Sequence, residues 1–512
     1  MLPTPPDTES LLTEADIATC IRILKCIEAD RGLLTQLTQL QRRDLLTAAG
    51  LVAKPEKQDL VKMAKAFRRA ERETEKAQDR QVIEQTALRR QRQAPVYAPL
   101  WIAPTEADVA AERPTLNQEL SCYVCKQPFV KLHRYYDSLC ESCGDFNYAK
   151  RTQTADLSGH YALVTGARVK IGFNASLKLL RAGAHVIVTT RFPVDAADRY
   201  AQEPDFPAFA DRLQIHGLDL RHTPSVEIFS RFLLERLPRL DYILNNACQT
   251  VRRPPGFFQH LISREEQAFG GLSEPLRHVL AHHHELVQAV EGPAGHRAQH
   301  LVTAAHPTPG DGLVHSAALS QRQYLDEDFQ ESAGLFPSGH YDEDRQQVDL
   351  RQTNSWRLRM HEVATAELLE VQLINAIAPY ILNARLKPLM LRTPGQHKHI
   401  VNVSAMEGQF YRATKTDKHP HTNMAKAALN MMTRTSAVDF VKDGIHMNAV
   451  DTGWVTDEDP AVHAARKAEQ GFAPPLDIID GAARIVDPIF EGQRTGTQVW
   501  GQFLKDYKPA PW

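Results

Sequence analysis

The sequence predicts an α/β fold, a doubly wound parallel sheet preceded by a helical region and a small zinc module. Three observations predict it. From Leu157 onward, short apolar segments alternate with amphipathic ones, which is typical of parallel strands covered on both faces by helices. Residues 120–150 hold two Cys-x-x-Cys pairs. Residues 10–93 contain little Gly or Pro and no strand-like alternation, so we expect helices there.

The segment Tyr161–Gly172 (YALVTGARVKIG) begins the predicted sheet. Its apolar run ends in Thr165-Gly166, and Gly172 opens an amphipathic run that leads to a second apolar segment, His185–Thr190. A strand, a tight glycine turn and a helix in this order leave a helix N-terminus free to receive phosphate. The unit therefore predicts the first βαβ of a dinucleotide-binding sheet.

Further strand ends follow in order. A third strand ends at Leu218-Asp219-Leu220, where a carboxylate can accept a hydrogen bond from the adenine amino group. The later strands are Leu240–Leu244 before Asn245-Asn246-Ala247, Ile400–Ser404, and Met447–Val450 before Asp451–Thr456. These motifs resemble the short-chain dehydrogenase/reductase (SDR) family, which is marked by TGxxxGIG, a strand-ending Asp, NNAG, a Ser strand, YxxxK and PGxxxT. The resemblance covers 157–512 apart from an insertion at about 252–355, and it implies a Rossmann-type sheet.

The resemblance implies NADP(H) rather than NAD(H). Arg168 and Arg191 lie where NADP-preferring members carry basic residues, and no acid follows the second strand. The alternative is that both are ordinary surface charges. Lys170 replaces the middle glycine, so we expect the loop to depart from the family pattern and to bring a cation near the pyrophosphate. The residues expected at the cofactor are Thr165, Gly166, Arg168, Lys170, Ile171, Gly172, Arg191, Asp219, Leu220, Asn246, Lys426 and Thr456.

The family's catalytic residues match only in part. Lys426 corresponds to the lysine of YxxxK and Asn375 to the supporting helix asparagine, but Thr422 stands at the tyrosine position. Ala405 occupies the place of the catalytic serine, one residue after Ser404. A threonine hydroxyl is too weak an acid to protonate a carbonyl near neutral pH. We therefore expect the proton donor to be His419 or His421, with Tyr411 as a further candidate. The alternative is that these histidines are loop residues facing solvent.

The insertion at 252–355 would emerge at the carboxyl edge of the sheet, where ligands bind in open α/β folds. It could form a lid, a substrate pocket or a docking domain. Its cluster of histidines includes an i, i+4 pair that could hold a metal, but a polar helix face is the expected role; the residues are His278, His282, His283 and His284.

Two cysteine pairs predict a structural zinc site. Cys122 and Cys125 are separated by 14 residues from Cys140 and Cys143, a spacing that can place four thiolates around Zn²⁺. The neighbouring basic and aromatic residues are also typical of some nucleic-acid-binding ribbons. We favour a metal-stapled module that docks the helical region onto the sheet. Cys20, Cys26 and Cys248 are interpreted as packing residues.

The expected domains are a helical region at 1–95, a Pro-rich linker at 96–119, the zinc module at 120–150 and the SDR-like domain at 157–512. One long helix is expected over Lys57–Arg92, with eleven Lys/Arg against six Asp/Glu. Such a helix is either solvated or binds an acidic partner.

The formal net charge of −2 gives no general attraction to nucleic acid or membranes. No membrane span or secretory signal is visible, so we expect a cytoplasmic protein. Three functions are consistent with these features. They are an NADP(H)-dependent oxidoreductase of a small-molecule carbonyl or enoyl substrate, a catalytically degenerate NADP(H)-binding sensor or scaffold, and a nucleic-acid-binding protein. A homo-oligomer formed through the SDR-like domain is consistent with these functions. So are protein or nucleic-acid partners of the N-terminal modules.

Overall fold

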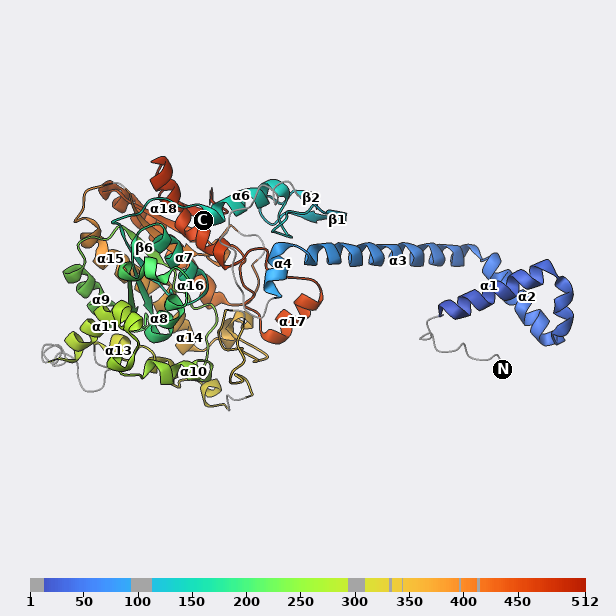
Figure 1. The fold of residues 1–512 in the computed structure, drawn as a ribbon, viewed down its shortest axis with the longest axis horizontal. Coiled ribbons are helices and arrows are strands. Elements are labelled where there is room, and N and C mark those ends of the chain that lie inside the picture. The colour runs from blue at the N-terminus through green and yellow to red at the C-terminus, as the bar shows by residue number, and fades with distance from the viewer. Residues whose placement is uncertain are drawn as a thin grey trace. The chain divides into compact units, whose positions relative to one another are not determined.

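The computed structural model describes residues 13–93, 113–292, 309–330, 334–342, 344–395, 397–411 and 415–512 (Figure 1). The chain divides into two compact units, Met1–Gln78 and Asp79–Trp512. In the described parts of the chain, no helix combines the length and apolar character needed to cross a membrane.

The first unit is helical. It contains α1 (Glu14–Ala29), α2 (Gln39–Ala53) and most of α3 (Lys57–Glu84). Thr13 begins α1 with a capping box, because its hydroxyl accepts from the Asp16 N–H and the Asp16 carboxylate accepts from the Thr13 N–H. None of the described apolar side chains in this unit is buried.

The single long helix expected over Lys57–Arg92 is wrong. Helix α3 ends at Glu84, and a separate short helix, α4, covers Ala87–Arg92. Thr86 lies at the break, and its hydroxyl donates to the Ile83 carbonyl. This local hydrogen bond competes with continuation of the helix.

The second unit is built on an eight-stranded sheet in the order β10-β9-β8-β7-β6-β3-β4-β5. Its strands are parallel except β10, which pairs antiparallel with β9. The sheet confirms the predicted doubly wound α/β class. The bounds are β3 (Tyr161–Thr165), β4 (His185–Thr190), β5 (Leu213–Gly217), β6 (Tyr242–Asn245), β7 (Lys398–Ser404), β8 (Ile445–Asp451), β9 (Phe503–Lys505) and β10 (Lys508–Ala510).

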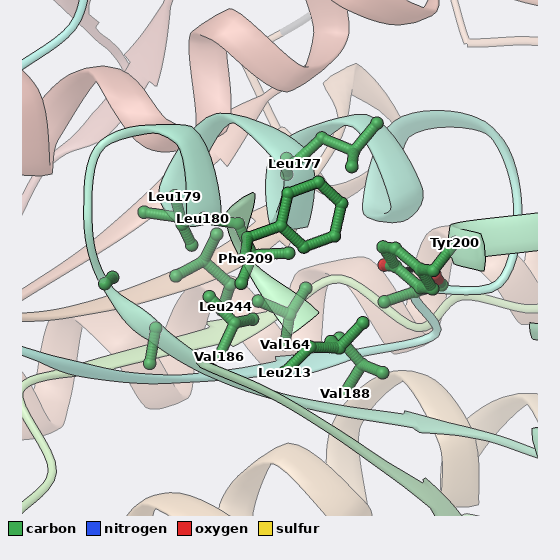
Figure 2. Close-up of a cluster of buried hydrophobic side chains, with 14 of the residues drawn as sticks. Val164, Leu177, Leu179, Leu180, Val186, Val188, Tyr200, Phe209, Leu213 and Leu244 are labelled. Carbon is green, nitrogen blue, oxygen red and sulfur yellow. Dashed lines mark hydrogen bonds between the residues drawn. The ribbon is translucent and has the colours of Figure 1, made fainter. Parts of the chain in front are cut away.

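Helices cover both faces of this sheet because successive strand residues point to opposite sides. Val164 packs on the face covered by α7 (Lys170–Arg181) and α18 (Ile478–Thr495), and Figure 2 shows part of that apolar cluster. Its neighbour Leu163 packs on the opposite face. That face is covered by α9 (Thr223–Arg236), α15 (Ala378–Met390) and α16 (Pro420–Phe440).

The cysteine pairs lie in a small module formed by the hairpin β1 (Thr115–Ser121) and β2 (Pro128–Lys131) and the helix α6 (Glu141–Thr152). Strand β1 begins inside the segment expected to be linker, and residues 96–112 of that segment lie outside the described residues. The packing role expected for Cys20, Cys26 and Cys248 is wrong, because all three are exposed.

The described part of the insertion contains α10 (Pro255–Glu265), α11 (Glu274–Glu291) and α13 (Asp311–Val314). Helix α11 packs on the edge strand β5, where His283 Nδ1 accepts from the Gly217 N–H at 3.3 Å. Burial lowers the pKa of His283 to about 4. Among the described residues, the histidines of α11 join no cluster of metal-ligating side chains.

Candidate nucleotide-binding site

A cavity of about 840 Å³ opens beside the residues that follow the carboxyl ends of the parallel strands. Its lining includes every residue expected at the cofactor except Thr165: Gly166, Arg168, Lys170, Ile171, Gly172, Arg191, Asp219, Leu220, Asn246, Lys426 and Thr456. The sheet topology brings these distant segments to one edge.

The glycine turn is closed too tightly for any side chain. Gly166 has φ +65°, and a Cβ there would lie 2.7 Å from the Ala247 Cα. A Cβ on Gly172 would lie 2.3 Å from both the Asn246 Nδ2 and the Gly166 carbonyl oxygen. Asn246 Nδ2 donates to the carbonyls of Thr165 and Gly166 at 3.0 Å. The turn is therefore locked against the end of β6.

Thr165 does not line the cavity, but it positions the backbone that follows β6 beside it. Its buried hydroxyl accepts from the Ala247 N–H at 3.0 Å and donates to the Leu244 carbonyl at 3.4 Å. It holds the chain after β6 in register with the glycine turn.

Lys170 keeps a glycine-like backbone. Its φ of +54° lies in the left-handed region, which residues other than glycine rarely adopt. Its Nζ lies 3.5 Å from the Asp344 carboxylate of the insertion. Burial lowers the pKa of Lys170, but the carboxylates of Asp344, Glu458 and Asp342 raise it by more, so the net shift is upward.

The N-terminus of α7 presents backbone N–H groups to the cavity. Val169 precedes the helix without making a side-chain cap, and the first turn carries no acidic residue. The first N–H groups of a helix have no intrahelical acceptor, and the helix dipole favours an anion there. The arrangement suits a phosphate group.

The two arginines expected near the 2′-phosphate have different surroundings. Arg168 is paired with Asp195 at 2.7 Å, so its charge is already neutralised. Arg191 makes no ion pair or side-chain hydrogen bond within the described chain, and its guanidinium lies over the Phe258 ring at 4.5 Å. Burial, with the nearby Arg221, lowers the pKa of Arg191 to about 10. An anion at Arg191 would relieve that electrostatic cost.

Asp219 is held by an arginine that the sequence motifs did not indicate. Arg221 donates to both Asp219 oxygens at 2.6–3.1 Å and also pairs with Glu370 at 2.7 Å. Burial raises the pKa of Asp219, but Arg221 outweighs it and the net shift is downward. The only sequence signal for this pair is a cation two residues after the strand-ending acid.

The residues expected at the nicotinamide half converge at the other side of the cavity. Lys426 is buried and its Nζ donates to the Val403 carbonyl at 2.7 Å. Thr456 donates to Glu458 at 2.8 Å. Ser404 and Ala405 also line this part, and the Ser404 hydroxyl donates to Asn430 at 2.6 Å.

Asn375 acts on the cavity through the backbone of Gln249. It lies in a π-helical turn, Leu373–Ile377, between α14 (Thr365–Gln372) and α15. Its side chain accepts from the Gln249 N–H at 2.9 Å and donates to the Gln249 carbonyl at 3.1 Å. Gln249 lines the cavity and Asn375 does not.

The structure does not bring the candidate proton donors into the cavity lining. His419 stacks on Trp356 with ring centroids 3.9 Å apart, and burial lowers its pKa to about 4. His421 is buried with Nε2 3.6 Å from the Glu367 carboxylate, and Tyr411 is 76% exposed. The lining as described contains neither tyrosine nor histidine.

The four cysteines of the module form one cluster. The sulfurs of Cys122, Cys125, Cys140 and Cys143 all lie within 4.8 Å of one another, and the Cys125 and Cys140 sulfurs are 3.7 Å apart. A tetrahedral Zn²⁺ with Zn–S bonds of about 2.3 Å would separate its sulfurs by about 3.8 Å. The cluster is compatible with such a site.

This module packs against the segment that lines the nicotinamide side of the cavity. Its buried Tyr135 and Tyr136 share an apolar cluster with Val455 and Leu476. The hydroxyls of the two tyrosines donate to the carboxylates of Asp477 at 2.8 Å and Asp480 at 2.5 Å.

The parallel sheet, the glycine turn and the cavity at the strand ends together define a Rossmann-type nucleotide-binding protein. Two family models match the chain in order, short chain dehydrogenase over residues 160–265 and Enoyl-(Acyl carrier protein) reductase over residues 353–473. The chain belongs to the short-chain dehydrogenase/reductase family of oxidoreductases, as the sequence motifs indicated.

Two individual relatives are similar to this chain. Uncharacterized protein R665 of Acanthamoeba polyphaga mimivirus is 31% identical over 398 residues, which cover 75% of this chain and 74% of that protein. Human Retinol dehydrogenase 11 is 29% identical over 114 residues, covering 22% of this chain and only 36% of the human protein.

Two solved structures are similar to this chain at low identity. NADPH-bound carbonyl reductase from chicken fatty liver is 16% identical with a TM-score of 0.40, covering 70% of this chain and 100% of that chain. The RhlG/NADP complex of Pseudomonas aeruginosa is 17% identical with a TM-score of 0.41, covering 68% and 95%.

Proposed function

We propose that this chain is an NADP(H)-dependent oxidoreductase that acts on a carbonyl or enoyl group of a small molecule. The observation that carries the cofactor assignment is Arg191. Its guanidinium is at the cavity, at the end of β4, and no carboxylate of the described chain pairs with it. A 2′-phosphate would supply the missing counter-charge, whereas NAD(H) offers only hydroxyls.

The remaining cavity residues fit the rest of the dinucleotide. The glycine turn and the N-terminus of α7 suit the diphosphate, and Thr456 and Lys426 lie on the side proposed for the nicotinamide. When bound, NADPH supplies a hydride. The Lys426 Nζ donates a hydrogen bond to the Val403 carbonyl. Of the residues predicted to be catalytic, Lys426 is the one that lines the cavity.

A second candidate is an NADP(H)-binding sensor or scaffold. The observation that favours it is the position of the candidate acids, because His419 contacts Trp356 and His421 contacts Glu367, both away from the cavity lining. The helical unit and the cysteine module would then bind a protein or nucleic-acid partner.

One experiment separates the two candidates. The full chain is mixed with NADPH and a panel of carbonyl and enoyl compounds, and loss of NADPH absorbance is compared for the unmodified chain and Lys426→Ala. An oxidoreductase oxidises NADPH with at least one compound, and Lys426→Ala abolishes that turnover. Tight NADPH binding without oxidation across the panel supports the sensor.

We also propose that Cys122, Cys125, Cys140 and Cys143 bind a structural Zn²⁺, since four thiolates leave no open position for catalysis. Such thiols suit a reducing compartment, and we place the chain in the cytoplasm. Elemental analysis should find about one zinc per chain. Cys140→Ser should lose it, and Cys26→Ser, which changes an exposed cysteine outside the cluster, should retain it.

A further inference from the structure

Arg92 reaches the cofactor cavity from outside the segments that match the family models. It lies at the end of α4, and it lines the same cavity as Ile171, Gly172 and Thr456. Its position is well fixed, because Leu88 is buried against the cysteine module and the Gln91 side-chain oxygen lies 2.9 Å from the Tyr135 hydroxyl.

The guanidinium of Arg92 has hydrogen-bond capacity to spare. Its Nη2 donates to the carbonyls of Leu476 at 2.6 Å and Val455 at 3.3 Å. Its Nε and Nη1 have no partner among the residues that the structure describes, and no carboxylate there pairs with it. A guanidinium offers five N–H donors in a planar fork that matches phosphate oxygens.

Most cations of the cavity are already neutralised. Arg168, Lys170 and Arg221 pair with Asp195, Asp344 and Asp219, and the arginines of the insertion pair with its own acids. Arg92, Arg191 and Lys426 line the cavity without a carboxylate partner in the described parts of the chain. Arg191 is assigned to the 2′-phosphate, and Lys426 lies on the nicotinamide side.

Val455, whose carbonyl Arg92 contacts, reaches from the nicotinamide side of the cavity to the first turn of α7. The side chains of Val455 and Ile171 converge over Gly481, where an added Cβ would lie 3.2 Å from Val455 and 2.8 Å from Ile171. Ile171 is in the first turn of α7, whose free N–H groups point to an anion site. A diphosphate on this helix end would lie beside the segment that Arg92 contacts.

Building on the proposed function, we infer that Arg92 binds the diphosphate of the dinucleotide, so that α4 completes a cofactor site otherwise made by the SDR domain. The ligand chemistry is a dinucleotide diphosphate rather than an anionic group of the substrate. The other source of the same chemistry, a phosphate or carboxylate on the substrate, is an outcome of the test.

The test uses calorimetry on the full chain with two ligands, NADP⁺ and adenosine 2′-phosphate, which lacks the diphosphate. Arg92→Gln should weaken NADP⁺ about 10–100-fold, the range for loss of a charged hydrogen bond. The affinity of Arg92→Gln for adenosine 2′-phosphate should equal that of the unmodified chain. Arg191→Ala should weaken both ligands. Arg90→Gln, which removes an exposed cation from the same helix, should change neither.

Arg92→Lys distinguishes lost phosphate binding from a folding defect. It keeps the positive charge that attracts the diphosphate, but it cannot reproduce the guanidinium's hydrogen bonds to the two carbonyls. It should keep NADP⁺ affinity closer to the unmodified chain than Arg92→Gln does. Unchanged NADP⁺ affinity in Arg92→Gln, with or without a changed KM for substrate, overturns the inference, as does equal weakening of both ligands. Failure of the unmodified chain to bind NADP⁺ would instead overturn the proposed function.

Discussion

The hydroxyl oxygen of Tyr123 accepts a hydrogen bond from the backbone N–H of Trp454 at 2.9 Å. Tyr123 lies between the first two cysteines of the cluster, and Trp454 lies between Thr452 and Val455, which line the cavity. A Cβ added to Gly453 would lie 3.5 Å from the Tyr123 hydroxyl, so the two segments pack directly. The cysteine module therefore supports one wall of the cavity.

Metal removal should weaken cofactor binding as well as stability. A zinc ion present at 100 times its Kd stabilises the folded state by about 2.7 kcal/mol, so Cys140→Ser should lower the free energy of unfolding by roughly that amount or more. NADP⁺ affinity should fall with it, because the 452–456 segment loses its support. Calorimetry and denaturant unfolding of a zinc-free chain measure both quantities.

Tyr123→Phe isolates the link between the module and the cavity. It leaves the cysteines in place, so zinc content should not change. Loss of the hydrogen bond to Trp454 should lower the free energy of unfolding by about 0.5–1.5 kcal/mol. A zinc-free Cys140→Ser chain with full stability and unchanged NADP⁺ affinity would show that the module does not support the cavity.

The glycine turn should tolerate no side chain at Gly172. An added Cβ would lie 2.3 Å from the Asn246 Nδ2 and the Gly166 carbonyl, so Gly172→Ala should destabilise the chain by about 1–3 kcal/mol and abolish NADP⁺ binding. Gly270→Ala is the matched control, because its Cβ would meet nothing within 4 Å. Wild-type binding by Gly172→Ala would contradict the turn geometry.

Acidification should destabilise the chain partly through His419. Its folded pKa of about 4 lies below the unfolded value of about 6.5, so the unfolded chain binds the proton more readily between these values. Its contribution is present above pH 6.5 and is lost as pH falls toward 4. His419→Phe keeps a ring against Trp356 and should make stability less dependent on pH in this window. Denaturant unfolding at several pH values measures the slope, and an unchanged slope would refute the assignment.

Strands β3 to β8 could be predicted because each is a short apolar run ending in a turn signal. Strands β9 and β10 were missed because each has three residues, and their turn carries Asp506 and Tyr507 at φ +48° and +67° without a glycine. The backbone of Lys170 could not be predicted either, because its left-handed conformation is imposed by its surroundings rather than by its residue type.

The cofactor positions could be predicted because they follow strands whose ends the topology brings together. Three other features of the site could not be predicted from the sequence. Arg221 holds Asp219, Arg92 enters the cavity from α4, and His419 is fixed on Trp356. The Arg221 contact is local and its one sequence signal is the short spacing, whereas the other two depend on tertiary contacts between segments with no common sequence pattern; Arg92 and Leu476 are 384 residues apart.

The affinity of the full chain for NADPH and NADH, measured by calorimetry with and without Arg191→Ala, tests the central claim most directly. The unmodified chain should bind NADPH more tightly by about 1.5–3 kcal/mol, the value of a charged hydrogen bond to the 2′-phosphate. Arg191→Ala should bind both cofactors alike. Equal affinity of the unmodified chain for NADPH and NADH, or no binding of either, would contradict the proposed function.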